Sequence, residues 1–169
     1  MIFQIGEKVV YPNQGVGTIE NVSTRTFGSQ FEKFYLFRLT CNSLTVMVPF
    51  SHVEHLGLRK VTRNGEVERV LAFLANGSCV RCTDWKNRFR ENSEKMRTGG
   101  LFETAEVLKS LLLLQRKKPL SFREKKMLDR ARHMLITEIS TSRGIDAPGA
   151  VGVLQKALAK AALSLPTAL

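Results

Sequence analysis

The first sixty residues alternate apolar and polar positions in short runs, a pattern typical of half-buried β-strands. Turn residues bound the runs: Pro12-Asn13-Gln14-Gly15 follows the first, and Cys41-Asn42-Ser43 precedes the last, which Pro49 ends. Several short strands in about 50 residues predict a small, strongly bent antiparallel barrel of the SH3 or Tudor type. So small a sheet has free edges, which are either protected or used to bind a partner strand. The predicted strands cover residues 9–11, 16–22, 34–39 and 44–48.

From about residue 64 the apolar positions recur every three or four residues, which predicts helices. Four are expected, over residues 65–75, 83 or 84 to 97, 102–116, and from 122 onward. Ser121 with Glu124 forms a capping box at the start of the fourth helix. A loop is expected over residues 144–152 and a short last helix over residues 153–163. The apolar stripe of the fourth helix comprises Phe122, Met127, Leu128, Ala131, Leu135 and Ile139.

The change of period divides the chain into two parts joined near residues 57–64. We therefore expect an α+β protein with two domains: an SH3/Tudor-like antiparallel barrel over residues 1–62 and an all-helical domain over residues 63–169. A length of 169 residues suits two small domains.

The charge is strongly positive and unevenly spread. With 26 Lys and Arg against 15 Asp and Glu, the net charge is +11 and the pI is near 10. Residues 1–60 carry six basic and four acidic residues, a net of +2, and residues 61–169 carry 20 and 11, a net of +9. Such a field attracts polyanions, of which nucleic acid is the commonest, and the binding surface is expected in the second part.

The sequence also indicates the cellular compartment in which the protein works. No apolar run approaches the ~18 residues of a membrane span, and the first residues do not resemble a secretory signal. Three cysteines in a cysteine-poor chain favour a reducing interior. We therefore expect a cytoplasmic, nucleoid-associated protein.

Catalytic and metal signatures are weak. Cys79 and Cys82 have the C-x-x-C spacing of zinc and redox sites, and His52 with His55 could complete a tetrahedron. However, the histidines follow a strand and the cysteines lie between helices, so buried thiols and surface histidines are the favoured interpretation. No nucleophile elbow, P-loop or dinucleotide-binding pattern is present. We expect no enzyme activity, metal or cofactor; a zinc-dependent regulator or redox sensor is the alternative.

Basic residues line two of the predicted helices. Lys86, Arg90 and Arg97 share one face, with Arg88 and Lys95 nearby, and this spacing predicts phosphate binding. Trp85 lies in the first turn of that helix, where it is either a core anchor or a wedge against nucleic acid. On the fourth helix the basic residues are Arg123, Lys126, Arg130 and His133, widened by Lys125 and Arg132.

Motifs along nearly the whole chain resemble the CarD/CdnL family of bacterial transcription factors. The first part carries Gly6-Glu7-Lys8-Val9-Val10-Tyr11-Pro12, Gly15-Val16-Gly17 and Gly57-Leu58-Arg59. The second part carries Trp85-x-x-Arg88-Phe89-Arg90 and Leu120-Ser121-x-x-Glu124-Lys125-Lys126-Met127-Leu128. The first set is similar to the family's RNA-polymerase-interacting domain and the second to its helical DNA-binding domain.

The resemblance implies a monomer that docks on the RNA polymerase β subunit through a strand edge and binds promoter DNA at the upstream edge of the transcription bubble. Contacts are to shape and phosphate rather than to sequence, and Trp85 wedges at the junction to prolong the open complex. Arg25 matches a polymerase-contacting arginine, whereas Met47 stands where some members have another. A nucleoid or architectural protein without a polymerase partner is the alternative. The expected polymerase-binding residues are Arg25, Val46, Met47 and Val48, and the expected DNA-binding residues are Trp85, Lys86, Arg88, Arg90, Lys125, Lys126 and Arg130.

Overall fold

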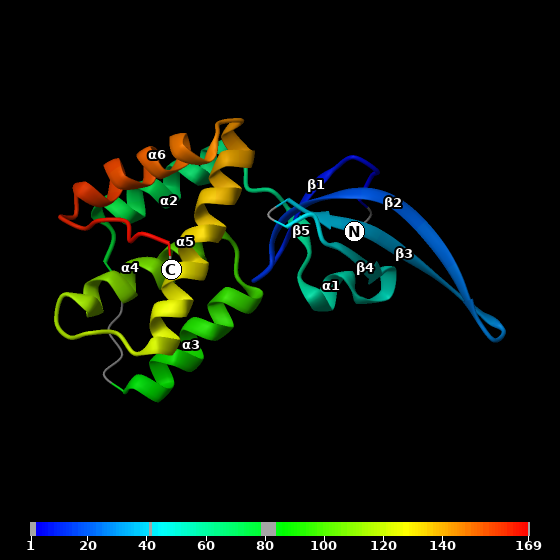
Figure 1. Cartoon of the computed structure of the whole chain (residues 1–169), viewed down its shortest axis with the longest axis horizontal. Helices are drawn as coiled ribbons and strands as arrows, with labels where there is room; N and C mark the ends of the chain where they lie inside the picture. Colours follow the sequence, from blue (N-terminus) through cyan, green and yellow to red (C-terminus); the bar gives the residue numbers. More distant parts are fainter. Residues whose placement is uncertain (1–2, 41, 79–83, 169) are drawn as a thin grey trace. The chain divides into compact units, whose positions relative to one another are not determined.

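The structure is a computed structural model that describes residues 3–40, 42–78 and 84–168, with the backbone alone for Trp85 and Thr98. The chain forms two compact units, Met1–Val61 and Thr62–Leu169, a division one residue from the expected one. The first unit is an antiparallel sheet and the second is helical (Figure 1), which confirms the predicted α+β class.

The sheet unit contains five antiparallel strands in the order β4-β3-β2-β1-β5. Four of them lie where the alternating pattern predicted strands, and the two-residue β5 was not predicted. Because β4 and β5 are each paired on one side only, the described sheet is open, with an edge at either end. The strands are β1 (Lys8–Tyr11), β2 (Gly15–Phe27), β3 (Gln30–Leu39), β4 (Thr45–Pro49) and β5 (Arg59–Lys60).

The core of this unit packs against one face of the sheet. Tyr35 stacks on Phe50 with a ring separation of 4.1 Å, and its hydroxyl accepts a hydrogen bond from the Phe3 backbone N–H at 2.9 Å. Gly17 is required where β2 passes β3, because a Cβ there would lie 2.4 Å from the Arg38 carbonyl oxygen. The short helices η1 (Phe50–His52) and α1 (Val53–Leu56) follow β4, and Val53 belongs to the same core.

The hairpin formed by β2 and β3 extends well beyond the rest of the sheet (Figure 1). Its register runs to the Phe27–Gln30 pair, and Gly28 turns the chain with a φ of 63°. The predicted strands, which ended at residue 22 and began again at residue 34, were too short. Residues 23–33 are mostly exposed, so they show no alternation of buried and polar positions.

The helical unit is built around α4, which is buried on most of its circumference. The pattern located the first four helices, but the expected loop over residues 144–152 was wrong. Gly144 ends α5 with a φ of 65°, and Asp146 caps α6 by accepting from the Gly149 N–H at 2.8 Å. The helices are α2 (Asn64–Asn76), α3 (Trp85–Thr98), α4 (Leu101–Gln115), α5 (Phe122–Arg143) and α6 (Ala147–Ala159).

Two buried ionisable side chains satisfy backbone groups at the ends of the core. Lys109 donates to the carbonyl oxygens of Phe73 at 2.8 Å and Gly77 at 2.6 Å, where α2 ends. Glu138 of α5 accepts from the backbone N–H of Thr62 at 2.9 Å. These contacts hold the first residue of the helical unit and the end of α2 against the bundle.

Candidate nucleic-acid interface

A buried ion pair joins the first turns of α3 and α5. The Arg88 guanidinium donates through Nε at 3.2 Å and Nη2 at 3.1 Å to the same oxygen, Oε2 of Glu124, and both side chains are about nine-tenths buried. The other Glu124 oxygen accepts from the Ser121 hydroxyl at 3.1 Å, and that hydroxyl caps α5 by accepting from the Glu124 N–H at 3.2 Å. The capping residue of one helix is thereby connected to an arginine of the other.

This ion pair gives Arg88 a structural role beside its predicted part in DNA binding. Its side chain is only 10% exposed, and two of its nitrogens are on Glu124. A guanidinium in that position orients the two helices. The helical spacing had grouped Arg88 with its exposed neighbours because the partner lies 36 residues away in the chain.

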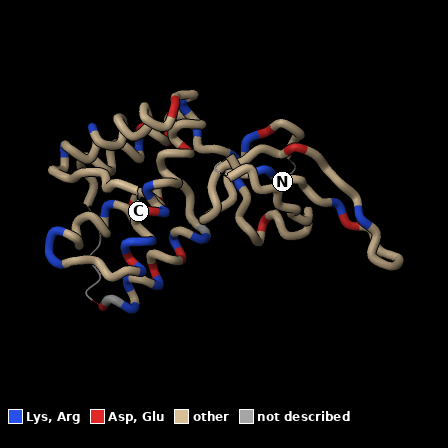
Figure 2. Tube along the Cα trace, viewed as in Figure 1, with Lys and Arg blue, Asp and Glu red and all other residues tan. Residues whose placement is uncertain are grey.

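The other predicted cations are exposed around this link. We call Lys86 and Arg90 of α3, with Lys125, Lys126 and Arg130 of α5, the basic surface; all five are exposed. Residues 116–126, from the α4–α5 loop into α5, hold six Lys or Arg and one acidic residue, which is the buried Glu124. Figure 2 marks Lys and Arg along α3, α5 and that loop. Such a concentration of exposed cations suits a polyanion.

Aromatic rings lie among these cations. The Arg123 guanidinium sits over the Phe89 ring at 4.4 Å, and the Lys126 ammonium over the Phe122 ring at 4.7 Å. Phe122 is 69% exposed, so its predicted place in the apolar stripe of α5 was wrong. The stripe is otherwise confirmed, because Leu128, Leu135 and Ile139 are buried. Phe122 is the first residue of α5, six residues before Leu128, where the stripe reaches the core.

Trp85 is the first residue of α3, within the first turn where the sequence placed it. Asp84 caps the helix there by accepting from the Lys86 N–H at 3.1 Å. The Trp85 side chain lies outside what the structure describes, so the choice between core anchor and wedge stays open. The ion pair of Arg88, one turn later, fixes the start of the helix that carries Trp85.

The alternative metal site gains no support within the described residues. Cys79 and Cys82 lie outside them. His52 and His55 are exposed, and residues 3–40, 42–78 and 84–168 hold no group of three side chains suited to a metal ion.

In the sheet unit, two of the predicted contact residues share one face. Met47 pairs directly with Leu36, and Arg25 pairs with Glu32; the alternation along β3 sets Leu36 and Glu32 on the same side of the sheet. Phe34, opposite Pro49, lies between these pairs on that side. Met47 therefore lies in an apolar strip with a charged pair at its end.

The backbone of Met47 also faces outward at the edge of the sheet. The Leu39 N–H donates to the Leu44 carbonyl at 2.9 Å, so hydrogen-bonded pairs alternate from there along the ladder. Val46 and Val48 therefore direct their backbone groups to β3, while Thr45, Met47 and Pro49 direct theirs to the open side. No strand pairs with that side in the described part of the chain.

The same geometry distinguishes Val46 and Val48 from Met47 among the predicted contact residues. They pair with Phe37 and Tyr35, which are core residues, and Val48 is 1% exposed. Both their side chains and their backbone groups are used within the unit. Of the three neighbours, Met47 is the one whose side chain lies on the face away from the core and whose backbone groups point to the open side of β4.

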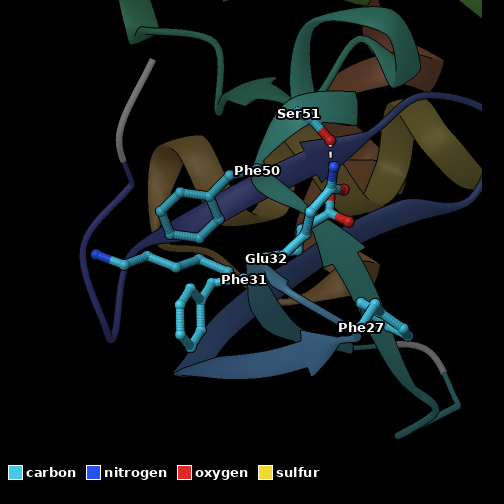
Figure 3. Close-up of a pocket in the computed structure, with 7 residues that line it drawn as sticks. Phe27, Phe31, Glu32, Phe50 and Ser51 are labelled. Carbon is cyan, nitrogen blue, oxygen red and sulfur yellow. Dashed lines mark hydrogen bonds between the residues drawn. The ribbon is translucent and has the colours of Figure 1, made fainter.

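A pocket of about 430 Å³ opens near the hairpin tip (Figure 3). Phe31 and Phe50 contribute rings to it, and the Ser51 hydroxyl donates to Glu32 at 2.5 Å. Phe31 is 77% exposed, so the pocket presents an accessible aromatic ring beside polar side chains. The polar groups that line it do not form a nucleophile–base arrangement, and its chemistry suits contact with a protein side chain. Its other lining residues are Phe27, Gln30 and Lys33.

Comparison with known families covers both units. Residues 3–62 match the family described as the CarD-like/TRCF RID domain, and residues 69–155 match the CarD C-terminal domain. The chain belongs to the CarD-like family of transcription factors. The resemblance stated from the sequence motifs is thus confirmed.

One relative in this family is the "Putative transcription factor YdeB" of Bacillus subtilis (strain 168). It is 35% identical over 144 residues, which cover 85% of this chain and 94% of the relative. The solution structure of the 72-residue N-terminal domain of Myxococcus xanthus CarD is 34% identical and covers 34% of this chain and 77% of that one, with a TM-score of 0.30. Among the described residues, no helix is long and apolar enough to cross a membrane.

Proposed function

We propose that this protein docks on the β subunit of bacterial RNA polymerase through its sheet unit and binds DNA at the upstream edge of the transcription bubble through its helical unit. Binding both at once stabilises the promoter open complex without reading sequence. The observation that carries the proposal is the exposed basic surface on α3 and α5, set beside a buried ion pair in a CarD-like chain.

The basic surface supports phosphate contact more than base readout. Its members are Lys and Arg, whose cations suit phosphate oxygens. The exposed amide beside them, Asn87, accepts a hydrogen bond from the Arg90 guanidinium at 2.9 Å through its oxygen. Contacts of this class fix position along the duplex but carry little sequence information. Binding should therefore be weak, salt-dependent and tolerant of sequence.

The edge of β4 supports docking on a protein. A partner strand would find backbone donors at Thr45 and Met47 and apolar contact from Met47 itself. Arg25, on the same face, would meet an acidic group of the partner. The pocket near the hairpin tip adds accessible aromatic area to this unit. Met47 in place of arginine makes the contact more apolar than in members that carry the arginine.

Trp85 is assigned the wedge role within this proposal. It begins a helix whose first turn is held by the Arg88–Glu124 pair, so a ring there would be presented from a fixed backbone. Stacking of a base on such a ring hinders reannealing of the bubble.

The decisive experiment measures the lifetime of a promoter open complex with and without the protein, using purified polymerase and a competitor that traps released enzyme. A longer lifetime supports the proposal. If the lifetime is unchanged while the protein binds DNA and does not bind the isolated β-subunit lobe, it is instead an architectural DNA-binding protein.

A further inference from the structure

Phe122 is an exposed aromatic ring within a strongly cationic region. Its side chain is 69% exposed, and the Lys126 ammonium lies 4.7 Å from its centroid. Burial does not explain the residue, because the stripe of α5 that enters the core begins at Leu128. The backbone of Phe122 is held at the first position of a capped helix, so the ring is presented from a fixed point.

The charge around the ring selects the class of partner. Arg123, Lys125 and Lys126 follow it within one turn, and Glu124, the acidic residue of that turn, is buried against Arg88. A protein surface that is apolar or has few acidic residues offers no anions to pair with three adjacent cations. A nucleic acid gains phosphate contacts at the same place where it meets the ring.

The Arg88–Glu124 ion pair also links the helix that begins with Phe122 to the helix that begins with Trp85. Each is the first residue of its helix, and the Arg88–Glu124 pair joins the first turns of those helices. Two aromatic residues thus start two helices that are fastened to each other at that end.

We propose that Phe122 stacks on an unpaired base of DNA and is a second aromatic contact beside the assigned role of Trp85. The inference rests on the proposed DNA-binding function. A flat ring reaches the face of a base only when that base has lost a stacked neighbour, as at a melted junction. Within an intact duplex only base edges are accessible in the grooves. Because every base has such a face, the contact adds preference for unpaired DNA and not for sequence.

The test compares two DNAs with equal numbers of phosphates, a full duplex and a fork with one unpaired arm, by fluorescence anisotropy with the full-length protein. The parent should bind the fork more tightly. Phe122→Ala should lose roughly five- to a hundred-fold of fork affinity, the range of base–aromatic stacking. Phe122→Tyr should keep most of it, and Phe122→Leu, which is apolar without a ring, should not.

Two controls make the result specific. A fork whose unpaired arm lacks bases should remove the difference between parent and Phe122→Ala. Phe102→Ala removes another exposed phenylalanine, at the start of α4, and should keep the fork preference. Thermal melting of each variant checks that the fold is retained.

The outcomes separate the two proposals. If the parent binds neither DNA, the proposed function fails and this inference fails with it. If the parent binds both DNAs but Phe122→Ala keeps the full fork preference, or weakens fork and duplex equally, the stacking contact is wrong and the proposed function stands.

Discussion

The two units expose different kinds of surface: the sheet unit is richer in exposed apolar side chains, and the helical unit is richer in positive charge. The sheet unit has a net charge of +2 over residues 1–60, whereas residues 61–169 carry +9. Among the described residues, five of the seven large exposed hydrophobic side chains belong to the sheet unit and two to the helical unit. Apolar contact is insensitive to salt and favours a protein partner, while clustered cations favour a polyanion and weaken as salt rises. Binding of the two proposed partners should therefore respond to different perturbations.

The largest effect is expected from the buried ion pair. Arg88→Met leaves the Glu124 carboxylate buried without its partner, which should cost about 3–5 kcal/mol of folding free energy. The helical unit should unfold more readily and DNA binding should fall, while polymerase binding by the sheet unit persists. Denaturant unfolding and a β-subunit pull-down on the same preparation measure both.

The matched control is Arg97→Ala, which removes an exposed pair with Glu94 at 2.9 Å. Exposed pairs contribute less than about 1 kcal/mol. Equal stability of the two variants would contradict the structural role assigned to Arg88.

The next effect concerns docking by the sheet unit. Met47→Glu introduces a charge into the apolar strip and should weaken binding to the β-subunit lobe at least tenfold, or about 1.4 kcal/mol. Arg25→Glu should weaken it too, and more strongly at low salt because the contact is electrostatic. Binding measured by interferometry at two salt concentrations tests both.

Lys8→Glu, an equal charge reversal at an exposed position of β1, serves as the control and should bind like the parent. If the Met47 and Arg25 variants are folded and bind as tightly as this control, the assigned face is not the docking face.

Trp85→Ala should separate binding from function. As a wedge, Trp85 contributes about 1–3 kcal/mol of stacking, so its loss should shorten the open complex roughly five- to more than a hundred-fold while recruitment persists. As a core anchor, its loss should instead cost about 3–5 kcal/mol of stability. Melting temperature and open-complex lifetime distinguish the two. A large fall in melting temperature with parallel loss of DNA binding would contradict the wedge role of Trp85.

The smallest effect is expected from single members of the basic surface. Arg130→Gln should reduce the slope of log affinity against log salt by about one, the contribution of one phosphate contact. Lys8→Gln, in the sheet unit, should leave the slope unchanged. Titrations over a range of salt measure the slopes, and identical slopes for both variants would show that the charges of the two units contribute alike.

The sequence was sufficient where a residue's environment is set by its near neighbours. Alternation located four strands, helical spacing located four helices, and the capping box at Ser121 marked the start of α5. Each of these signals is read within one or two turns or one strand.

It was insufficient where the environment comes from distant residues. Arg88 and the exposed arginines look alike in the helical pattern, and only Glu124 from another helix distinguishes them. Phe122 fits the spacing of a buried stripe, but the bundle does not extend to it. Spacing predicts which residues share a face but not where the neighbouring helix ends.

Pro49 limits edge-to-edge association of this chain with its own copies along β4. A long flat edge templates the addition of further copies, and such growth leads to fibrils. Here the open strand has five residues, and its last residue faces outward without an N–H to donate. Along β4, a second copy would find donors at Thr45 and Met47 alone. This edge can receive one short strand from a partner, and Pro49 stops a longer ladder from forming along β4.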